Sequence, residues 1–260
     1  MTDLDRRRDV ALAVAAEAGA LALEYQRDPA SLVVDAKGPQ DWVTIADREV
    51  ERLVRRRLTD AFAGDAVMGE EDGGQVADQL WVVDPIDGTT NFLRGLPEYA
   101  VSIAYVESGV VELGVIFAPA LGHTWVAQRG QGATCDGRAI RVRGGAKIEE
   151  AVITVGFDFK QGVEPFLGCL ERILRSGAAF RRFGAATIGL VSVASGHVDA
   201  FWQMRLNPWD VLAGLLIVQE AGGRTNDFLA DGGLEHGNPT LACAPGVADA
   251  IADLVGIPLM

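Results

Sequence analysis

The sequence predicts a layered α/β fold, because three hydrophobic patterns follow one another along its 260 residues. Apolar residues recur at helical spacing in two early segments, residues 10–25 and 50–58. Residues 99–142 contain β-rich runs divided by turn signals, which indicates an antiparallel meander. From residue 146 onward, strand-like and helix-like segments alternate. Elements in this order are expected to stack as layers of helices and sheets.

Each element is placed by its own signals. A buried strand is expected at residues 80–83, and Asp84-Pro85 is expected to end it. The strands of the meander are expected at residues 100–106, 110–117 and 124–128. The later elements are expected in this order: strand 151–156, helix 164–174, helix 185–194, strand 198–204, helix 209–221, a strand near Leu241 and helix 247–255.

Composition limits the class of protein. The chain is 49% apolar and can bury a substantial core. Its formal charge of −13 argues against binding to nucleic acids or anionic membranes, which require clustered Lys and Arg. Cys135, Cys169 and Cys243 are far apart, so no disulfide or zinc site is predicted and a reducing cytoplasm is expected. The N-terminal segment does not read as a signal peptide, and the longest apolar run, residues 211–218, is too short to span a bilayer.

The most informative segment is residues 81–92, where Asp84 and Asp87 stand three residues apart between an apolar strand and a glycine turn. Carboxylates are ligands that Mg²⁺ prefers, and the backbone N–H groups after Gly88 can bind phosphate oxygens. Taken alone, Asp-Pro and Asp-Gly are ordinary turn signals. Three further acidic segments accompany them, at residues 41–47, 69–71 and 209–223.

Together these segments resemble the inositol monophosphatase family of Mg²⁺-dependent, lithium-sensitive phosphomonoesterases. The resemblance begins at Lys37-Gly38, ends at residue 223, and is specific for the superfamily rather than for one substrate. It implies a single domain with the αβαβα sandwich fold, whose site lies between two halves, α+β over about residues 1–145 and α/β over residues 146–260. It also implies a homodimer that hydrolyses a small phosphate monoester with two or three Mg²⁺ ions.

The resemblance assigns metal ligands to matching positions. Glu70, Asp84 and the backbone carbonyl of Ile86 would hold one ion. Asp84, Asp87 and Asp210 would hold the second, so that Asp84 bridges the two. Asp210 stands at an expected helix start and could also cap that helix. A third, weaker ion would rest on Glu70.

The resemblance also assigns the catalytic groups. Asp47 would pair with Thr89 to orient and deprotonate the attacking water, with Glu70 contributing through its metal. An aspartate at a helix start is more often an N-cap, but the matching motif at residues 41–47 favours the functional role for Asp47. The backbone amides of Gly88, Thr89 and Thr90, at the start of a short helix, would bind phosphate beside Asp87.

Substrate identity stays open at this stage. Gln203 stands seven residues before Asp210, where relatives that prefer inositol phosphates have a glutamate. An amide can still bind a polyol but lacks the charge-assisted part of the bond. Ala186 matches the other alcohol-side position, and Arg205 is either a surface residue or a charge for a second anion. Inositol 1-phosphate is the first choice, followed by histidinol phosphate, fructose 1,6-bisphosphate, adenosine 3′,5′-bisphosphate or another polyol phosphate.

Other functions are weighed against hydrolysis. No Walker loop or dinucleotide motif is present, and His123, His197 and His236 show no metal-ligand spacing, so no chemistry is assigned to them. At least one bacterial relative works with the transcription machinery, so an interaction protein is the main alternative. A basic patch would support it, but the arginines at positions 52 and 55–57 read more simply as the solvated face of a helix. A metal-storage module would leave the pairing of Asp47 with Thr89 unexplained.

Overall fold

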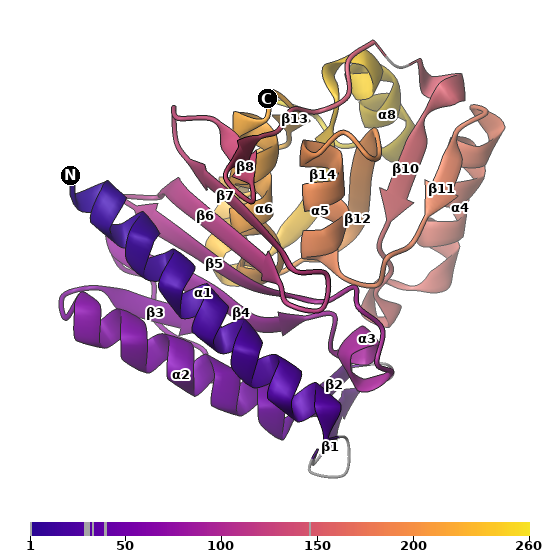
Figure 1. Cartoon of the computed structure of the whole chain (residues 1–260). Helices are drawn as coiled ribbons and strands as arrows, with labels where there is room; N and C mark the ends of the chain where they lie inside the picture. Colours follow the sequence, from indigo (N-terminus) through magenta and orange to yellow (C-terminus); the bar gives the residue numbers. More distant parts are fainter. Residues whose placement is uncertain (1, 29–31, 33, 39–40, 146) are drawn as a thin grey trace.

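The computed structural model describes the chain except for residues 1, 29–31, 33, 39–40 and 146. It stacks five layers in the order αβαβα (Figure 1). Helices α1 (Asp3–Arg27) and α2 (Ile45–Ala61) cover one face of a large sheet. Helices α5 (Ala186–Ala194) and α6 (Pro208–Glu220) lie between this sheet and a smaller one. Helices α4 (Val163–Arg175) and α8 (Ala248–Val255) cover the outer face of the smaller sheet. The predicted fold class is confirmed.

The larger sheet comprises seven strands among the described residues, in the order of the chain. They are β3 (Ala66–Gly69), β4 (Gln79–Asp87), β5 (Ala100–Glu107), β6 (Val110–Ala118), β7 (His123–Gln128), β8 (Ala133–Cys135) and β9 (Arg138–Ala139). Only the pairing of β3 with β4 is parallel within this sheet. The meander expected between residues 99 and 142 is therefore confirmed, and β3 and β4 extend it on one side.

The prediction that Asp84-Pro85 ends its strand is wrong. Strand β4 continues to Asp87, and its register against β5 shifts between Asp84, which pairs with Ser102, and Asp87, which pairs with Ala100. Three steps along β4 thus face two steps along β5, which is a β-bulge. A bulge bends a strand and redirects its side chains, so Pro85 reshapes the strand end that carries both carboxylates instead of terminating it.

The smaller sheet has the order β11-β10-β12-β14-β13. Its strands are β10 (Val152–Val155), β11 (Ala179–Arg181), β12 (Ala200–Leu206), β13 (Arg224–Thr225) and β14 (Asn238–Cys243). The first three run parallel, and β14 runs antiparallel to both β12 and β13. Strands β10, β12 and β14 and helices α4, α5, α6 and α8 lie where the sequence predicts them, whereas the short β11 and β13 give too few residues for a periodic signal.

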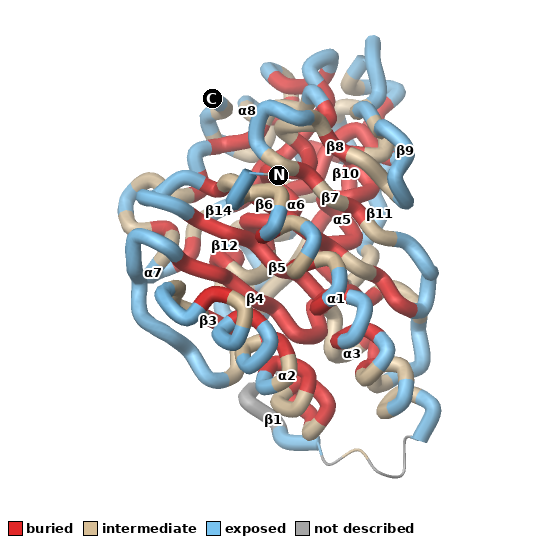
Figure 2. Tube along the Cα trace, turned by 60° about the vertical axis from the view of Figure 1, so that its left-hand side comes forward, coloured by how far each residue is buried: buried red, intermediate tan, exposed pale blue. Residues whose placement is uncertain are grey.

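The remaining elements are short. They are β1 (Val34–Gly38), β2 (Asp41–Thr44), α3 (Thr89–Leu93), α7 (Gly233–His236) and the 3-10 helices η2 (Ile148–Glu150), η3 (Phe159–Gln161), η4 (Ala230–Gly232) and η5 (Pro245–Val247). Helix α3 confirms the short helix expected after Gly88. Figure 2 shows buried residues along the strands and the central helices, with exposed residues on the outer elements. None of the described helices has the length and apolar character that crossing a bilayer requires.

Candidate active site

Three carboxylates from two layers meet in the interior. Asp84 and Asp87 come from the bulged end of β4, and Asp210 from the first turn of α6. One carboxylate oxygen from each lies within 4.8 Å of those of the other two. Asp84 is 1% exposed and Asp87 9% exposed. Buried carboxylates this close repel one another unless protons or cations neutralise them.

The surroundings of these carboxyl groups raise their pKa values. Burial raises the pKa of Asp84 well above its ordinary value, and the charges of Glu70, Asp87 and Asp210 raise it further. Burial also raises the pKa of Asp87, and burial together with the charge of Asp87 raises that of Asp210 to about 7. Among the described residues, the buried Oδ2 of Asp84 has no hydrogen-bond partner, whereas its Oδ1 accepts the N–H of Ile86 at 3.0 Å. This set of crowded oxygen donors fits a hard divalent cation such as Mg²⁺.

Asp87 is fixed by a residue that sequence reasoning missed. Thr187, fully buried in α5, donates its backbone N–H to Asp87 Oδ2 at 2.6 Å and also its hydroxyl to the same oxygen. These bonds connect residues 100 positions apart and join β4 to the central helix layer. No local pattern could have paired the two residues, because the contact depends on the stacking of layers.

Asp47 lies beside Thr89, as the sequence predicts, and the interpretation of Asp47 as an N-cap is wrong. Thr44 is the N-cap of α2 and donates its N–H and hydroxyl to Asp47 Oδ2, at 2.8 and 2.6 Å. The Thr89 hydroxyl donates to Asp47 Oδ1 at 3.1 Å, and the carbonyl of Ile86 lies 3.2 Å from the same hydroxyl. Burial raises the pKa of Asp47, and hydrogen bonds from Thr44 oppose the rise.

Asp210 repeats this arrangement and is likewise not the cap. Asn207 is the N-cap of α6, and its N–H donates to Asp210 Oδ2 at 2.7 Å. Both aspartates are the third residue of a helix and belong to capping boxes, Thr44-x-x-Asp47 and Asn207-x-x-Asp210. The spacing was visible in the sequence and could have placed both helix starts correctly. In each capping box, the backbone N–H of the N-cap residue donates to Oδ2 of the aspartate and thereby fixes that carboxylate at the start of its helix.

A second missed residue supports Glu70. Glu51 of α2 is fully buried and accepts the N–H groups of Glu71 and Asp72, at 2.7 and 3.0 Å, in the turn that follows β3. Glu70 is half-buried in the same turn. Glu51 also accepts from Arg55 Nε at 2.7 Å, and Arg55 donates to the carbonyl of Val67 at 2.9 Å. Glu51 therefore fixes the turn that presents Glu70.

This network corrects the expectation for the arginine run. The Arg55 side chain is only 22% exposed and reaches β3 and the turn after it, rather than lying on a solvated face. Arg52 and Arg57 do lie at the surface, where they pair with Glu49 and Glu17, each at 2.6 Å. Three of the four arginines are thus paired with carboxylates of the same chain, so the run does not form a patch of four free positive charges for a partner.

A cavity of about 720 Å³ opens above the carboxylates. The residues predicted from the sequence that line it are Glu70, Asp84, Ile86, Asp87, Gly88, Thr89, Thr90, Ala186, Gln203 and Asp210. Asp47 is 1% exposed and reaches this space through Thr89. Phe157, Phe159 and Arg182, which the sequence did not indicate, also line the cavity. The side chain of Lys37 lies outside the described residues, as does that of Asp41.

Gln203, which the sequence resemblance assigns to the alcohol side, lines the cavity. Its Nε2 donates to the carbonyl of Arg205 at 3.2 Å, and its amide packs so closely on Gly156 that a Cβ there would lie 1.6 Å from Oε1. Arg205 donates to the carbonyl of His236, so its guanidinium is engaged at the rim. Arg205 is exposed and lines the cavity, and its charge is not neutralised by a carbonyl partner, so both interpretations of this residue stay open.

Comparison with known proteins gives consistent results. Residues 3–255 match the model of the inositol monophosphatase family. The Nus factor SuhB of Pseudomonas aeruginosa is 40% identical over 85% of this chain and 84% of its own length. The fructose-1,6-bisphosphatase/inositol-1-monophosphatase of Thermotoga maritima is 43% identical over 74% of this chain and 73% of its own. The crystal structure of the suhB protein of Bartonella henselae superposes with a TM-score of 0.89 at 32% identity, over 95% of this chain and 97% of that one.

Proposed function

Because the chain belongs to the inositol monophosphatase family, we propose that it is a divalent-metal-dependent hydrolase of a small phosphate monoester. The observation that carries this proposal is the convergence of Asp84, Asp87 and Asp210 within 4.8 Å at the base of the cavity. The pairing of Asp47 with Thr89 at its edge supplies the second requirement, a group that can take a proton from water.

We propose Mg²⁺ as the cation, with two or three ions per site. Glu70, Asp84 and the carbonyl of Ile86 would hold one, and Asp84, Asp87 and Asp210 another. A third would rest on Glu70. When bound, the ions supply a lowered pKa for water and charge neutralisation at the departing oxygen. The raised pKa values of the ligands support this, because a cation would replace the protons that they otherwise retain.

The groups of the protein divide the remaining work. Thr89, whose hydroxyl is hydrogen-bonded to Asp47, orients a water molecule for attack on phosphorus. As the water attacks, one proton of the water passes by way of the Thr89 hydroxyl to the Asp47 carboxylate. The P–O bond to the alcohol breaks on the opposite side, and the departing oxygen takes a proton from solvent. The backbone N–H groups of Gly88, Thr89 and Thr90 bind the phosphate oxygens at the start of α3. Gly88 suits this position because its φ is 94° and a Cβ would lie 3.0 Å from the carbonyl of Glu98.

Inositol 1-phosphate is the first proposed substrate. A relative in Mesorhizobium japonicum is named inositol-1-monophosphatase and is 40% identical over 78% of this chain. The Gln203 amide lines the cavity and can bond to the hydroxyl groups of such a substrate. Another polyol or sugar phosphate is the alternative, since Phe157 and Phe159 in the cavity lining offer apolar contacts as well.

A substrate panel tests the proposal. The purified protein with Mg²⁺ is given inositol 1-phosphate, histidinol phosphate, fructose 1,6-bisphosphate, glycerol 2-phosphate and adenosine 3′,5′-bisphosphate, with and without Li⁺, and released phosphate is measured. We expect turnover that Li⁺ inhibits, fastest with inositol 1-phosphate. Absence of phosphate release from every compound would remove the proposal.

A role with the transcription machinery is the second candidate, because the P. aeruginosa relative is named a Nus factor. We propose it as an addition to hydrolysis, since the carboxylate cluster is complete. Co-purification with RNA polymerase tests the role with the transcription machinery.

A homodimer in the cytoplasm is also proposed. The exposed apolar side chains of Leu167 and Leu174 on α4 and of Phe180 on the edge strand β11 support self-association, and the three free cysteines support a reducing compartment. Light scattering in solution tests the homodimer.

A further inference from the structure

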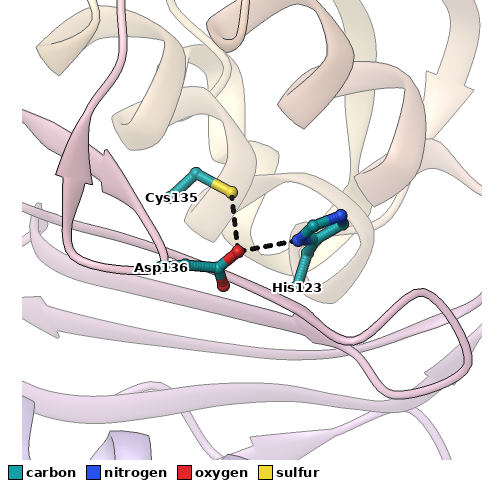
Figure 3. A group of neighbouring side chains, drawn as sticks. All are labelled: His123, Cys135 and Asp136. Atoms are coloured by element: carbon teal, nitrogen blue, oxygen red, sulfur yellow. Dashed lines mark hydrogen bonds and ion pairs between the residues drawn. The ribbon is translucent and has the colours of Figure 1, made fainter.

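A second cluster of metal-ligating side chains lies at the β7–β9 end of the large sheet and does not line the active-site cavity (Figure 3). His123 begins β7, Cys135 ends β8, and Asp136 follows in the turn to β9. The His123 Nδ1 lies 2.7 Å from Asp136 Oδ2, and the Cys135 Sγ lies 3.8 Å from the same oxygen. The sequence predicts no zinc site and no metal-ligand spacing for these residues, whereas the structure brings the side chains of His123, Cys135 and Asp136 together.

The backbone holds the three residues in this arrangement. Strands β7 and β8 pair with Trp125 opposite Cys135, which brings the two strand ends together. The N–H of Asp136 donates to the carbonyl of Thr124, and the N–H of Thr124 donates to Asp136 Oδ1, both at 2.9 Å. Asp136 has a φ of 50°, in the left-handed region. The second oxygen, Oδ2, is thereby aimed at His123 and Cys135.

The donor types decide which metal suits the cluster. An imidazole nitrogen, a thiolate and one carboxylate oxygen are ligands typical of Zn²⁺, whereas Mg²⁺ requires oxygen donors. In a tetrahedral zinc site, bond lengths of about 2.0–2.3 Å place neighbouring ligand atoms about 3.3–3.6 Å apart. The observed separations of 2.7 and 3.8 Å lie on either side of that range. The His123 and Asp136 side chains are 52% and 45% exposed, so both can turn slightly to admit an ion.

We propose that His123, Cys135 and Asp136 form a Zn²⁺ site with a fourth position open to water. His123 would bind through Nδ1, Asp136 through Oδ2, and Cys135 as a thiolate after releasing its proton to solvent. The thiolate and carboxylate charges balance the two charges of the ion. The site would fasten the β8–β9 edge to β7 and is independent of the phosphatase activity.

Co²⁺ is the probe that distinguishes this site from the active site. A Co²⁺ ion with a thiolate ligand absorbs in the near ultraviolet by charge transfer, and the all-oxygen cluster cannot produce that absorption. The reduced full chain, with excess Mg²⁺ present, is titrated with Co²⁺ and then with Zn²⁺. We expect one Co²⁺ per chain to give the absorption and one Zn²⁺ to abolish it. Absence of the absorption in the wild-type protein at saturating Co²⁺ would overturn the proposal.

Matched variants assign the ligands. Cys135→Ser should lose the absorption completely, whereas Cys169→Ser should keep it, because Cys169 lies on α4 beside Arg172. His123→Ala and Asp136→Asn should each weaken Zn²⁺ binding more than about tenfold, since even outer-shell partners contribute that much. Circular dichroism checks that each variant is folded. Retention of the absorption by Cys135→Ser, or its loss in Cys169→Ser, would contradict the assignment.

Discussion

Among the described residues, two clusters could hold a metal ion, and they differ in donor type and in burial. In the first cluster Asp84 and Asp87 are buried and Asp210 is half-buried; this cluster has only oxygen donors and joins two layers of the sandwich. In the second cluster His123 and Asp136 are exposed and Cys135 is half-buried; this cluster mixes nitrogen, sulfur and oxygen donors and lies at the ends of neighbouring strands of one sheet. Because oxygen donors suit Mg²⁺ and a thiolate with an imidazole suits Zn²⁺, donor type alone would direct different ions to the two clusters.

The largest expected effect is at the buried cluster. Asp84→Asn removes the charge that would bridge two ions, and we expect turnover at saturating Mg²⁺ to fall by at least about a thousandfold, a loss of several kcal/mol in transition-state stabilisation. Phosphate release is the measurement. Asp136→Asn is the matched change in the exposed cluster and should leave turnover unchanged. Substantial residual activity in Asp84→Asn would exclude the bridging role.

The proton-transfer pair should give the next effect. Thr89→Val keeps the size of the side chain and removes the hydroxyl that reaches Asp47, and we expect kcat to fall about a hundredfold or more. Thr90→Val, next to it, changes a side chain whose proposed contact is made by the backbone and should cost far less. Equal losses in the two variants would mean that the Thr89 hydroxyl has no special role.

These two effects concern residues that the sequence indicated. Asp84, Asp87 and Asp210 were found because their surroundings are local motifs, and the layered fold was found because its helices and inner strands are long enough to show periodicity. Glu51 and Thr187 were missed because each acts on a segment that only tertiary packing brings near. The exposed cluster was missed because the register of β7 against β8 unites His123 with Asp136, 13 residues apart.

Glu51 offers a test of positioning without contact to the substrate. Glu51→Gln removes one charged acceptor from the turn that carries Glu70, and we expect about a tenfold higher Mg²⁺ concentration for half-maximal activity, because Glu70 is less well fixed. The free energy of unfolding should fall by about 1–3 kcal/mol. Activity at saturating Mg²⁺ should recover most of its value. A loss of kcat that Mg²⁺ does not restore would assign Glu51 a direct catalytic role.

The buried cluster should also respond to pH in the absence of divalent ions. Asp210 has a pKa of about 7 in the folded protein against an ordinary value of 3.8, so the folded state binds its proton more tightly than the unfolded state. Its contribution to stability is complete below pH 3.8 and is lost as pH rises through about 7. In EDTA, the melting temperature should therefore fall between about pH 5 and pH 7, because the unfolded state releases this proton at lower pH than the folded state does.

Two controls sharpen the pH experiment. In Asp210→Asn the melting temperature should fall less over this pH interval, because the substituted side chain does not titrate. Added Mg²⁺ should reverse the fall, since the cation favours the ionised carboxylates. A melting temperature that rises equally in the wild type and in Asp210→Asn over this interval would contradict the assigned pKa shift.

The smallest expected effect concerns substrate choice. Gln203→Glu restores a charged acceptor on the alcohol side, and we expect kcat/KM for inositol 1-phosphate to rise by about threefold to tenfold, the gain of a charge-assisted hydrogen bond at a partly exposed position. Glycerol 2-phosphate is the comparison substrate and should gain less. If kcat/KM does not change for any substrate, Gln203 does not contact the alcohol.

On the proposed function, the carboxylates of Asp84, Asp87 and Asp210, and not the cluster around Cys135, hold the ions that activity requires. The most direct test is phosphate release from inositol 1-phosphate by Cys135→Ser protein, first in EDTA and then as Mg²⁺ is added back. We predict no turnover in EDTA and full recovery with Mg²⁺ to the rate of the wild type. Turnover that persists in EDTA, or that Mg²⁺ fails to restore without Cys135, would contradict the account.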